Sequence, residues 1–201
     1  MPKIVCFSGK SNSGKTTLIC KVALALREMD LRVNIIKHDP KNKAEFDTQG
    51  KEHNKDSFKF SQVAPRVAII SPQKSTILSS NQSNHNPQNL ATDSVNCANL
   101  KESKNATFKD ISEYEYTEFQ KIIGFFGDCD VVLIEGLKHL PYPRNVLFRE
   151  EIDEAYIPYA NAFALSREIA SDKHKMTKLP NLPIFDIDAP KQIAQFITKL
   201  T

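Results

Sequence analysis

The stretch Gly9-Lys10-Ser11-Asn12-Ser13-Gly14-Lys15-Thr16-Thr17 decides how this chain is interpreted. It fits the pattern G-x-x-x-x-G-K-[ST], the phosphate-binding loop (P-loop) of nucleotide-binding proteins. Apolar residues at 4–7 precede the loop and favour a buried strand. Residues 18–27 follow it with apolar side chains at helical spacing and no Gly or Pro. Strand, glycine-rich turn and helix, in this order, are the setting that a P-loop requires.

Each residue type in the loop has a chemical reason. Glycines let the loop curl so that successive backbone N–H groups face phosphate oxygens. The first turn of the helix adds N–H donors and the positive end of the helix dipole. Lys15 is predicted to bind the β- and γ-phosphates, and the Thr16 hydroxyl to ligate Mg²⁺. The residues predicted to surround the phosphates are Gly9, Lys10, Ser11, Asn12, Ser13, Gly14, Lys15, Thr16 and Thr17.

A second landmark is the apolar run at 130–134, which ends in Glu135 and Gly136. In P-loop proteins an acid at the end of a neighbouring parallel strand holds the magnesium, directly or through water. Glu135 is therefore predicted as a metal ligand and, with Lys15, as a catalytic residue. Gly136 would allow the backbone to approach the γ-phosphate. The alternative, in which Glu135 merely ends a strand, stays open.

Composition limits the possible classes of protein. The chain has 201 residues and a formal net charge of +3 with mixed signs, which predicts one domain over 1–201 and does not favour a nucleic-acid partner. Its four cysteines are scattered without a C-x-x-C pair, as in reduced cytosolic proteins. No apolar run approaches the roughly 20 residues of a membrane helix. We expect a cytoplasmic protein that is not bound to a membrane.

The remaining segments predict an α/β fold with a doubly wound, mostly parallel sheet of the P-loop NTPase type and a small β-hairpin. Residues 39–57 are expected to form a loop. Residues 80–109 are rich in Asn, Ser, Gln and Lys and predict a disordered insertion. The other predicted elements are strands at 31–38, 146–148, 161–166 and 182–187, helices at 58–64, 111–126 and 189–200, and a hairpin of 66–71 with 75–79 around Pro72-Gln73-Lys74.

Several short motifs together resemble the MobB family, the accessory P-loop proteins of molybdopterin guanine dinucleotide synthesis. The resemblance runs through nearly the whole chain. It rests on residues 13–18, Ile36-Lys37-His38, Lys55-Asp56-Ser57, the hairpin at 67–79, Glu135-Gly136-Leu137-Lys138-His139 and Val146-Leu147-Phe148-Arg149. It implies a homodimer that binds GTP and Mg²⁺ and assists a MobA-like molybdopterin guanylyltransferase.

The resemblance also suggests roles for single residues. It places Asp47 and Asp56-Ser57 in an acidic loop, where Asp47 is expected to join Thr16 and Glu135 at the metal; plain solvation of Asp47 and Asp56 stays an alternative. Lys10 is interpreted as a phosphate contact or an exposed lysine. The base-recognition segment is either Ser166-Arg167-Glu168 or Ala170-Ser171-Asp172.

Two functions follow as hypotheses. In the first, the chain is a GTP-binding accessory protein with at most slow hydrolysis, because no dedicated base or arginine finger is evident. In the second, it is a small-molecule or nucleotide kinase, which usually carries an arginine-rich lid. The few arginines of this sequence do not cluster as a lid requires. The accessory role is therefore preferred.

Overall fold

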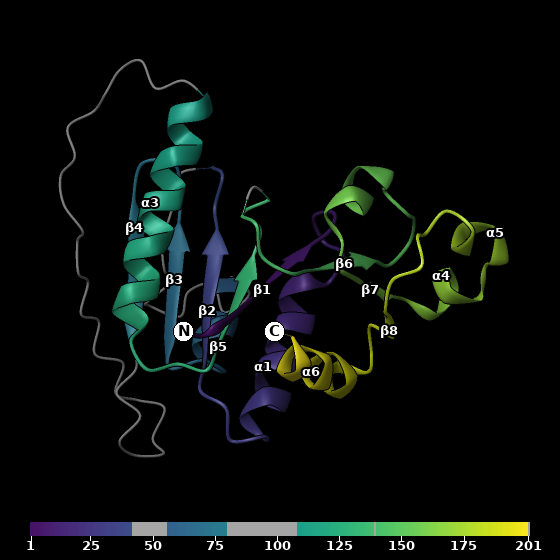
Figure 1. Ribbon diagram of the computed structural model, residues 1–201, viewed down its shortest axis with the longest axis horizontal. Helices are drawn as coiled ribbons and strands as arrows, with labels where there is room; N and C mark the ends of the chain where they lie inside the picture. Colours follow the sequence, from purple (N-terminus) through teal and green to yellow (C-terminus); the bar gives the residue numbers. More distant parts are fainter. Residues whose placement is uncertain (42–55, 80–107, 139, 201) are drawn as a thin grey trace. The chain divides into compact units, whose positions relative to one another are not determined.

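The computed structural model in Figure 1 describes residues 1–41, 56–79, 108–138 and 140–200. The chain divides into two units, one made of residues 1–33 and 130–201 and the other of residues 34–129. The single domain predicted over 1–201 stays a prediction. Of the insertion predicted at 80–109, residues 80–107 lie outside the described residues.

The first unit contains five parallel strands whose order differs from their order in the sequence. Most of their side chains are apolar, and β5, β6 and β7 are buried throughout, as expected for parallel strands that are covered on both faces. Because the strands are parallel, their carboxyl ends lie at one edge of the sheet. The P-loop begins at this edge, and Glu135 is the last residue of a strand that ends there. The spatial order is β5 (Val131–Glu135), β1 (Lys3–Ser8), β6 (Arg144–Phe148), β7 (Ala162–Leu165) and β8 (Ile184–Asp186).

Helices α1 (Lys15–Arg27) and α6 (Pro190–Lys199) pack against each other and against β1. Helix α1 buries Leu18, Ile19, Val22 and Leu26, which recur at helical spacing. It ends at Arg27, and Asp30, three residues later, adopts the left-handed conformation with φ 61°. Helix α6 begins with proline, whose missing N–H costs nothing at that position.

Another part of the first unit packs on β6 and β7. Phe148 and Phe163 stack with ring centroids 5.8 Å apart and form a buried cluster with Val146, Leu165 and Ile169. The segments around this cluster include three short helices, η1 (Glu154–Tyr159), α4 (Arg167–Ser171) and α5 (Lys173–Met176). The sequence analysis predicts none of them, because a helical repeat of apolar residues cannot be recognised in only four to six residues. Side-chain caps at their first residues could have indicated them.

The second unit holds the hairpin and two helices. Strands β2 (Val33–His38) and β3 (Arg66–Ile70) are parallel, and β4 (Ser75–Ser79) returns antiparallel to β3. Helices α2 (Asp56–Ser61) and α3 (Phe108–Phe126) pack against β3. The predicted hairpin is confirmed, and so is the predicted class of a doubly wound, mostly parallel α/β fold of the P-loop type.

Three predicted boundaries were wrong. Helix α2 begins at Asp56, inside the loop expected at 39–57, and α3 begins at Phe108 rather than at residue 111. Strand β6 begins at Arg144, two residues before the strand predicted at 146–148. Arg144 and Asn145 are polar yet buried, so the hydrophobic pattern could not assign them to a strand.

Arg32 and Asp130, which both belong to the first unit, form an ion pair with several hydrogen bonds. Arg32 donates from Nε to Asp130 Oδ2 at 3.1 Å and from a terminal nitrogen to Oδ1 at 3.2 Å. Its backbone N–H also donates to Oδ2, at 2.7 Å. The side-chain hydrogen bond, followed by the backbone bond, lowers the pKa of Asp130 below its ordinary value. Ionised Asp130 therefore stabilises the folded state above about pH 4, and this contribution is lost as the pH falls through the folded-state pKa.

We expect Asp130→Asn to lower the free energy of unfolding by about 1 kcal/mol at neutral pH, because the pair is exposed and screened by solvent. The difference from wild type should shrink toward about pH 2.5. Urea denaturation at both pH values measures it. Asp188→Asn is the matched control, since Asp188 makes one looser contact, with Lys21 at 3.6 Å. An equal loss for Asp130→Asn at both pH values would contradict an ionic origin.

Candidate P-loop site

The P-loop connects the end of β1 to the start of α1 through an unusual backbone path. Gly9, Asn12 and Gly14 have φ values of 150°, 62° and 91°. A Cβ on Gly9 would lie 2.7 Å from the Leu147 carbonyl oxygen of β6. Only glycine therefore fits at Gly9, because the loop lies directly against the neighbouring strand.

The side chain of Lys15 folds back over this loop. Its Nζ donates to the carbonyl oxygens of Gly9 at 3.0 Å and Lys10 at 2.6 Å. No side chain caps the N-terminus of α1, and its first turn has no acidic residue. The lysine charge and the positive end of the helix dipole thus act together, which favours an anion at this place.

Thr16 and Glu135 are brought together although 119 positions separate them in the chain. The Thr16 hydroxyl donates to Glu135 Oε1 at 3.3 Å, and Glu135 is only 9% exposed. Two neighbouring ligands of octahedral Mg²⁺, each at about 2.1 Å, lie about 3 Å apart. A hydroxyl and a carboxylate oxygen at this separation fit a Mg²⁺ that completes its shell with phosphate and water oxygens. In the described part of the chain, no group of three or more His, Cys, Asp or Glu could hold a metal.

The backbone after Glu135 is also constrained. Gly136 has φ 94° and donates its N–H to the Phe7 carbonyl of β1 at 3.2 Å. Leu137 follows in the left-handed region, with φ 48°. A branched side chain is rare in that conformation, so the surrounding structure must hold the loop in place.

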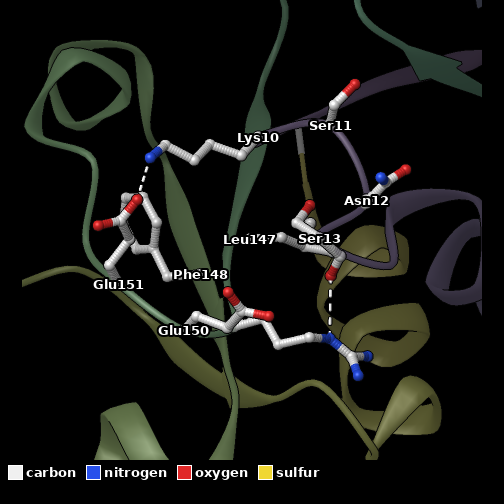
Figure 2. Close-up of a pocket in the computed structure, with 9 residues that line it drawn as sticks. Lys10, Ser11, Asn12, Ser13, Leu147, Phe148, Glu150 and Glu151 are labelled. Carbon is white, nitrogen blue, oxygen red and sulfur yellow. Dashed lines mark hydrogen bonds and ion pairs between the residues drawn. The ribbon is translucent and has the colours of Figure 1, made fainter.

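A cavity of about 130 Å³ lies beside the first half of the P-loop (Figure 2). Lys10, Ser11, Asn12 and Ser13 line it together with residues 147–151. The Lys10 side chain crosses toward Glu151 and forms an ion pair with it, and this hydrogen bond raises the pKa of Lys10. Both predicted roles of Lys10 remain predictions, but its charge has a partner on the same chain.

Arg149 contacts the P-loop, although the sequence analysis assigns it no role. It follows β6, and its Nε donates to the Ser13 carbonyl at 3.1 Å. A Cβ on Gly14 would lie 2.8 Å from one of its terminal nitrogens. Its own carbonyl accepts from the Ser166 hydroxyl at 2.6 Å. Arg149 therefore links the P-loop to Ser166, the N-cap of α4, and both segments considered for base recognition overlap α4 and its caps.

Arg144 was also missed. Its side chain is buried beside the P-loop strand, where it donates to the Ser8 hydroxyl at 2.8 Å. The surface next to it forms a second cavity, of about 410 Å³, lined also by Tyr142, Tyr159 and Asn161. Arg144 lies before the strand predicted at 146–148, so the sequence pattern gave no reason to expect a buried cation here.

The second unit contains the motif residues Lys37, His38 and Asp56. Lys37 Nζ pairs with Asp56 Oδ2 at 2.6 Å, and His38 Nε2 lies 2.7 Å from Glu115 Oε1. Asp56 thus has a specific partner rather than being simply solvated. Asp47, the third predicted metal ligand, lies outside the described residues. Among the helices that the structure describes, none is long and apolar enough to cross a membrane.

Comparisons with known proteins agree with this description. Residues 4–100 match the family model for MobB, molybdopterin guanine dinucleotide synthesis protein B. A molybdopterin-guanine dinucleotide biosynthesis adapter protein of Haemophilus influenzae is 26% identical over 198 residues, which cover 94% of this chain and 84% of that protein. A probable adapter protein of the same name from Bacillus subtilis is 33% identical over 75 residues, 37% of this chain. That match spans only 42% of the Bacillus protein.

The fold has a counterpart among solved structures. The crystal structure of Bacillus subtilis MobB superposes with a TM-score of 0.50 at 20% identity, covering 100% of this chain and 99% of that chain. At this identity the likeness concerns the fold alone. The family model, which matches residues 4–100, and the two sequence relatives confirm the resemblance to the MobB family that the short motifs predicted.

Proposed function

We propose that this chain binds Mg²⁺-GTP at its P-loop and acts as an adapter for a guanylyltransferase that forms molybdopterin guanine dinucleotide. The observation that carries the proposal is the grouping of Lys15, Thr16 and Glu135 around the start of α1, with 3.3 Å between the two oxygens that would face Mg²⁺. Similarity to the MobB family supplies the pathway, because the relatives are named for that synthesis.

In this proposal Lys15 exchanges its two carbonyl acceptors for phosphate oxygens, while the N-terminus of α1 stabilises their charge. Thr16 and Glu135 hold Mg²⁺, which neutralises phosphate charge when bound. GTP is preferred over ATP in the proposal because the product of the pathway contains guanine. The homodimer and the MobA-like partner come from the resemblance, as does a third metal ligand at Asp47.

Hydrolysis is proposed to be slow. Arg149 is engaged with the Ser13 carbonyl, and Arg144 is buried among carbonyl groups. Neither guanidinium is placed as an arginine finger, the group that accelerates hydrolysis in fast GTPases. Slow turnover suits a protein that presents bound nucleotide to a partner. We place this function in the cytoplasm, as expected from the scattered cysteines.

Calorimetric titration of the purified chain with GTP and ATP, each with Mg²⁺, tests the proposal directly. We expect GTP to bind more tightly with little turnover, and the activity of an added molybdopterin guanylyltransferase to rise. ATP preference with rapid phosphoryl transfer to a small acceptor would instead support the kinase alternative.

Lys15→Ala should weaken binding of GTP by at least about 100-fold, because it removes charge-assisted hydrogen bonds to the phosphates. Lys21→Ala is the matched control, since it removes the same charge from an exposed position of α1 that pairs loosely with Asp188 at 3.6 Å. Fluorescent nucleotide titration compares the two variants. Equal affinity of Lys15→Ala and wild type would refute the P-loop assignment.

Glu135→Gln should leave binding of GDP without metal nearly unchanged and reduce the gain in GTP affinity that Mg²⁺ provides by at least about tenfold. The amide keeps the shape of the side chain but removes the negative charge that the metal needs. Titrations with Mg²⁺ and with EDTA separate the two effects. A variant that loses GDP and Mg²⁺-GTP affinity equally would show that Glu135 is structural.

A further inference from the structure

Arg144, the first residue of β6, is a buried cation with an unusual set of partners. Its side chain is 2% exposed. No carboxylate among the described residues forms an ion pair with it. Burying a charge without a counter-charge is expensive unless hydrogen bonds replace the lost water. The interactions of the guanidinium must therefore compensate, and their pattern indicates what the residue does.

All of its acceptors are neutral oxygens from two segments. One terminal nitrogen donates to the Ser8 hydroxyl at 2.8 Å and to the Gly136 carbonyl at 3.3 Å. The other donates to the carbonyls of Leu137 at 3.2 Å, Lys138 at 3.3 Å and Leu140 at 3.2 Å. A planar guanidinium can make this many bonds in fixed directions, whereas a lysine ammonium has three donors on a flexible stem.

The two segments are the flanks of the candidate nucleotide site. Ser8 directly precedes Gly9, the first residue of the P-loop, and Gly136 directly follows Glu135, the proposed metal ligand. Leu137 is held at φ 48°, a conformation that needs support from its surroundings. Arg144 binds the Leu137 carbonyl and supplies such support.

The buried charge also acts on its surroundings. Burial raises the pKa of the Cys6 thiol to about 11, and the positive charge of Arg144 opposes this rise. The Arg144 guanidinium lies beside β1, so its positive charge also favours an anion at the end of that strand.

We propose that Arg144 is a positioning residue that holds the loop after Glu135 against Ser8, the residue before the P-loop, so that Glu135 and Gly136 are in place for the Mg²⁺-bound γ-phosphate. The inference rests on the proposed function, because it concerns the same site. Its mechanism lies in the geometry of the guanidinium and not in the charge alone.

The test compares Arg144→Lys with wild type in two measurements. Hydrogen exchange should show that the amides of residues 136–138 and 140 exchange at least about tenfold faster in the variant, because the carbonyls lose their common donor. Titrations should show that affinity for Mg²⁺-GTP falls at least about tenfold more than affinity for GDP. The diphosphate depends on Lys15 and the loop amides, which Arg144 does not touch.

Arg66→Lys is the matched control. Arg66 likewise binds carbonyl oxygens, those of Phe125 and Phe126, but it belongs to the second unit. This variant should keep wild-type nucleotide affinity. If Arg144→Lys does not fold, the same two measurements are made on Ser8→Ala, which removes only the hydroxyl on β1 that accepts from Arg144. It should produce the same selective loss for Mg²⁺-GTP, by about threefold or more.

The outcomes are separable. If wild type binds GTP and Arg144→Lys has the same exchange rates and nucleotide affinities, a positive charge at this position is enough for binding. The positioning role is then refuted. Equal losses for GDP and Mg²⁺-GTP would show a purely structural role and would also refute it. Failure of the wild-type chain itself to bind any nucleotide would overturn the proposed function, and this inference with it.

Discussion

The close approach of the P-loop to strand β6 is the constraint on which the rest of the site depends. Gly9 lies so near the Leu147 carbonyl that a single added carbon would be 2.7 Å from it. Gly14 has φ 91°, a conformation that side chains rarely adopt, and the end of the Arg149 side chain lies 2.8 Å from the position of an added Cβ. The loop is therefore packed against β6 and the Arg149 side chain. This packing leaves Lys15 and the start of α1 at the carboxyl edge of the sheet, where a phosphate group can bind.

Charge is arranged around this packed loop in a consistent way. Lys15 and the uncapped start of α1 provide positive potential, and Glu135 provides one nearby carboxylate, 3.3 Å from Thr16 Oγ1. Arg144 adds a cation from inside the unit, bonded only to neutral oxygens. A site with more positive than negative charge is suited to an anion that brings its own metal, as Mg²⁺-nucleotides do.

The sequence allowed the P-loop, the acid at the end of β5 and the hairpin to be predicted, because each is encoded in consecutive residues. Arg144 and Arg149 could not be predicted in their roles, because their partners lie far away in the chain: Ser8 and Ser13 are each 136 positions distant. Arg144 is also polar where a buried strand should be apolar, and so the start of β6 was placed too late. Short helices such as α4 and α5 lacked the length that periodicity requires.

The most direct test of this account is a crystal structure of the chain with Mg²⁺ and a non-hydrolysable GTP analogue. We expect Lys15 Nζ to have left the Gly9 and Lys10 carbonyls for the β- and γ-phosphates, and Mg²⁺ to lie between Thr16 and Glu135. Nucleotide bound away from α1, or the direct hydrogen bond between Thr16 and Glu135 retained in the complex, would contradict the account.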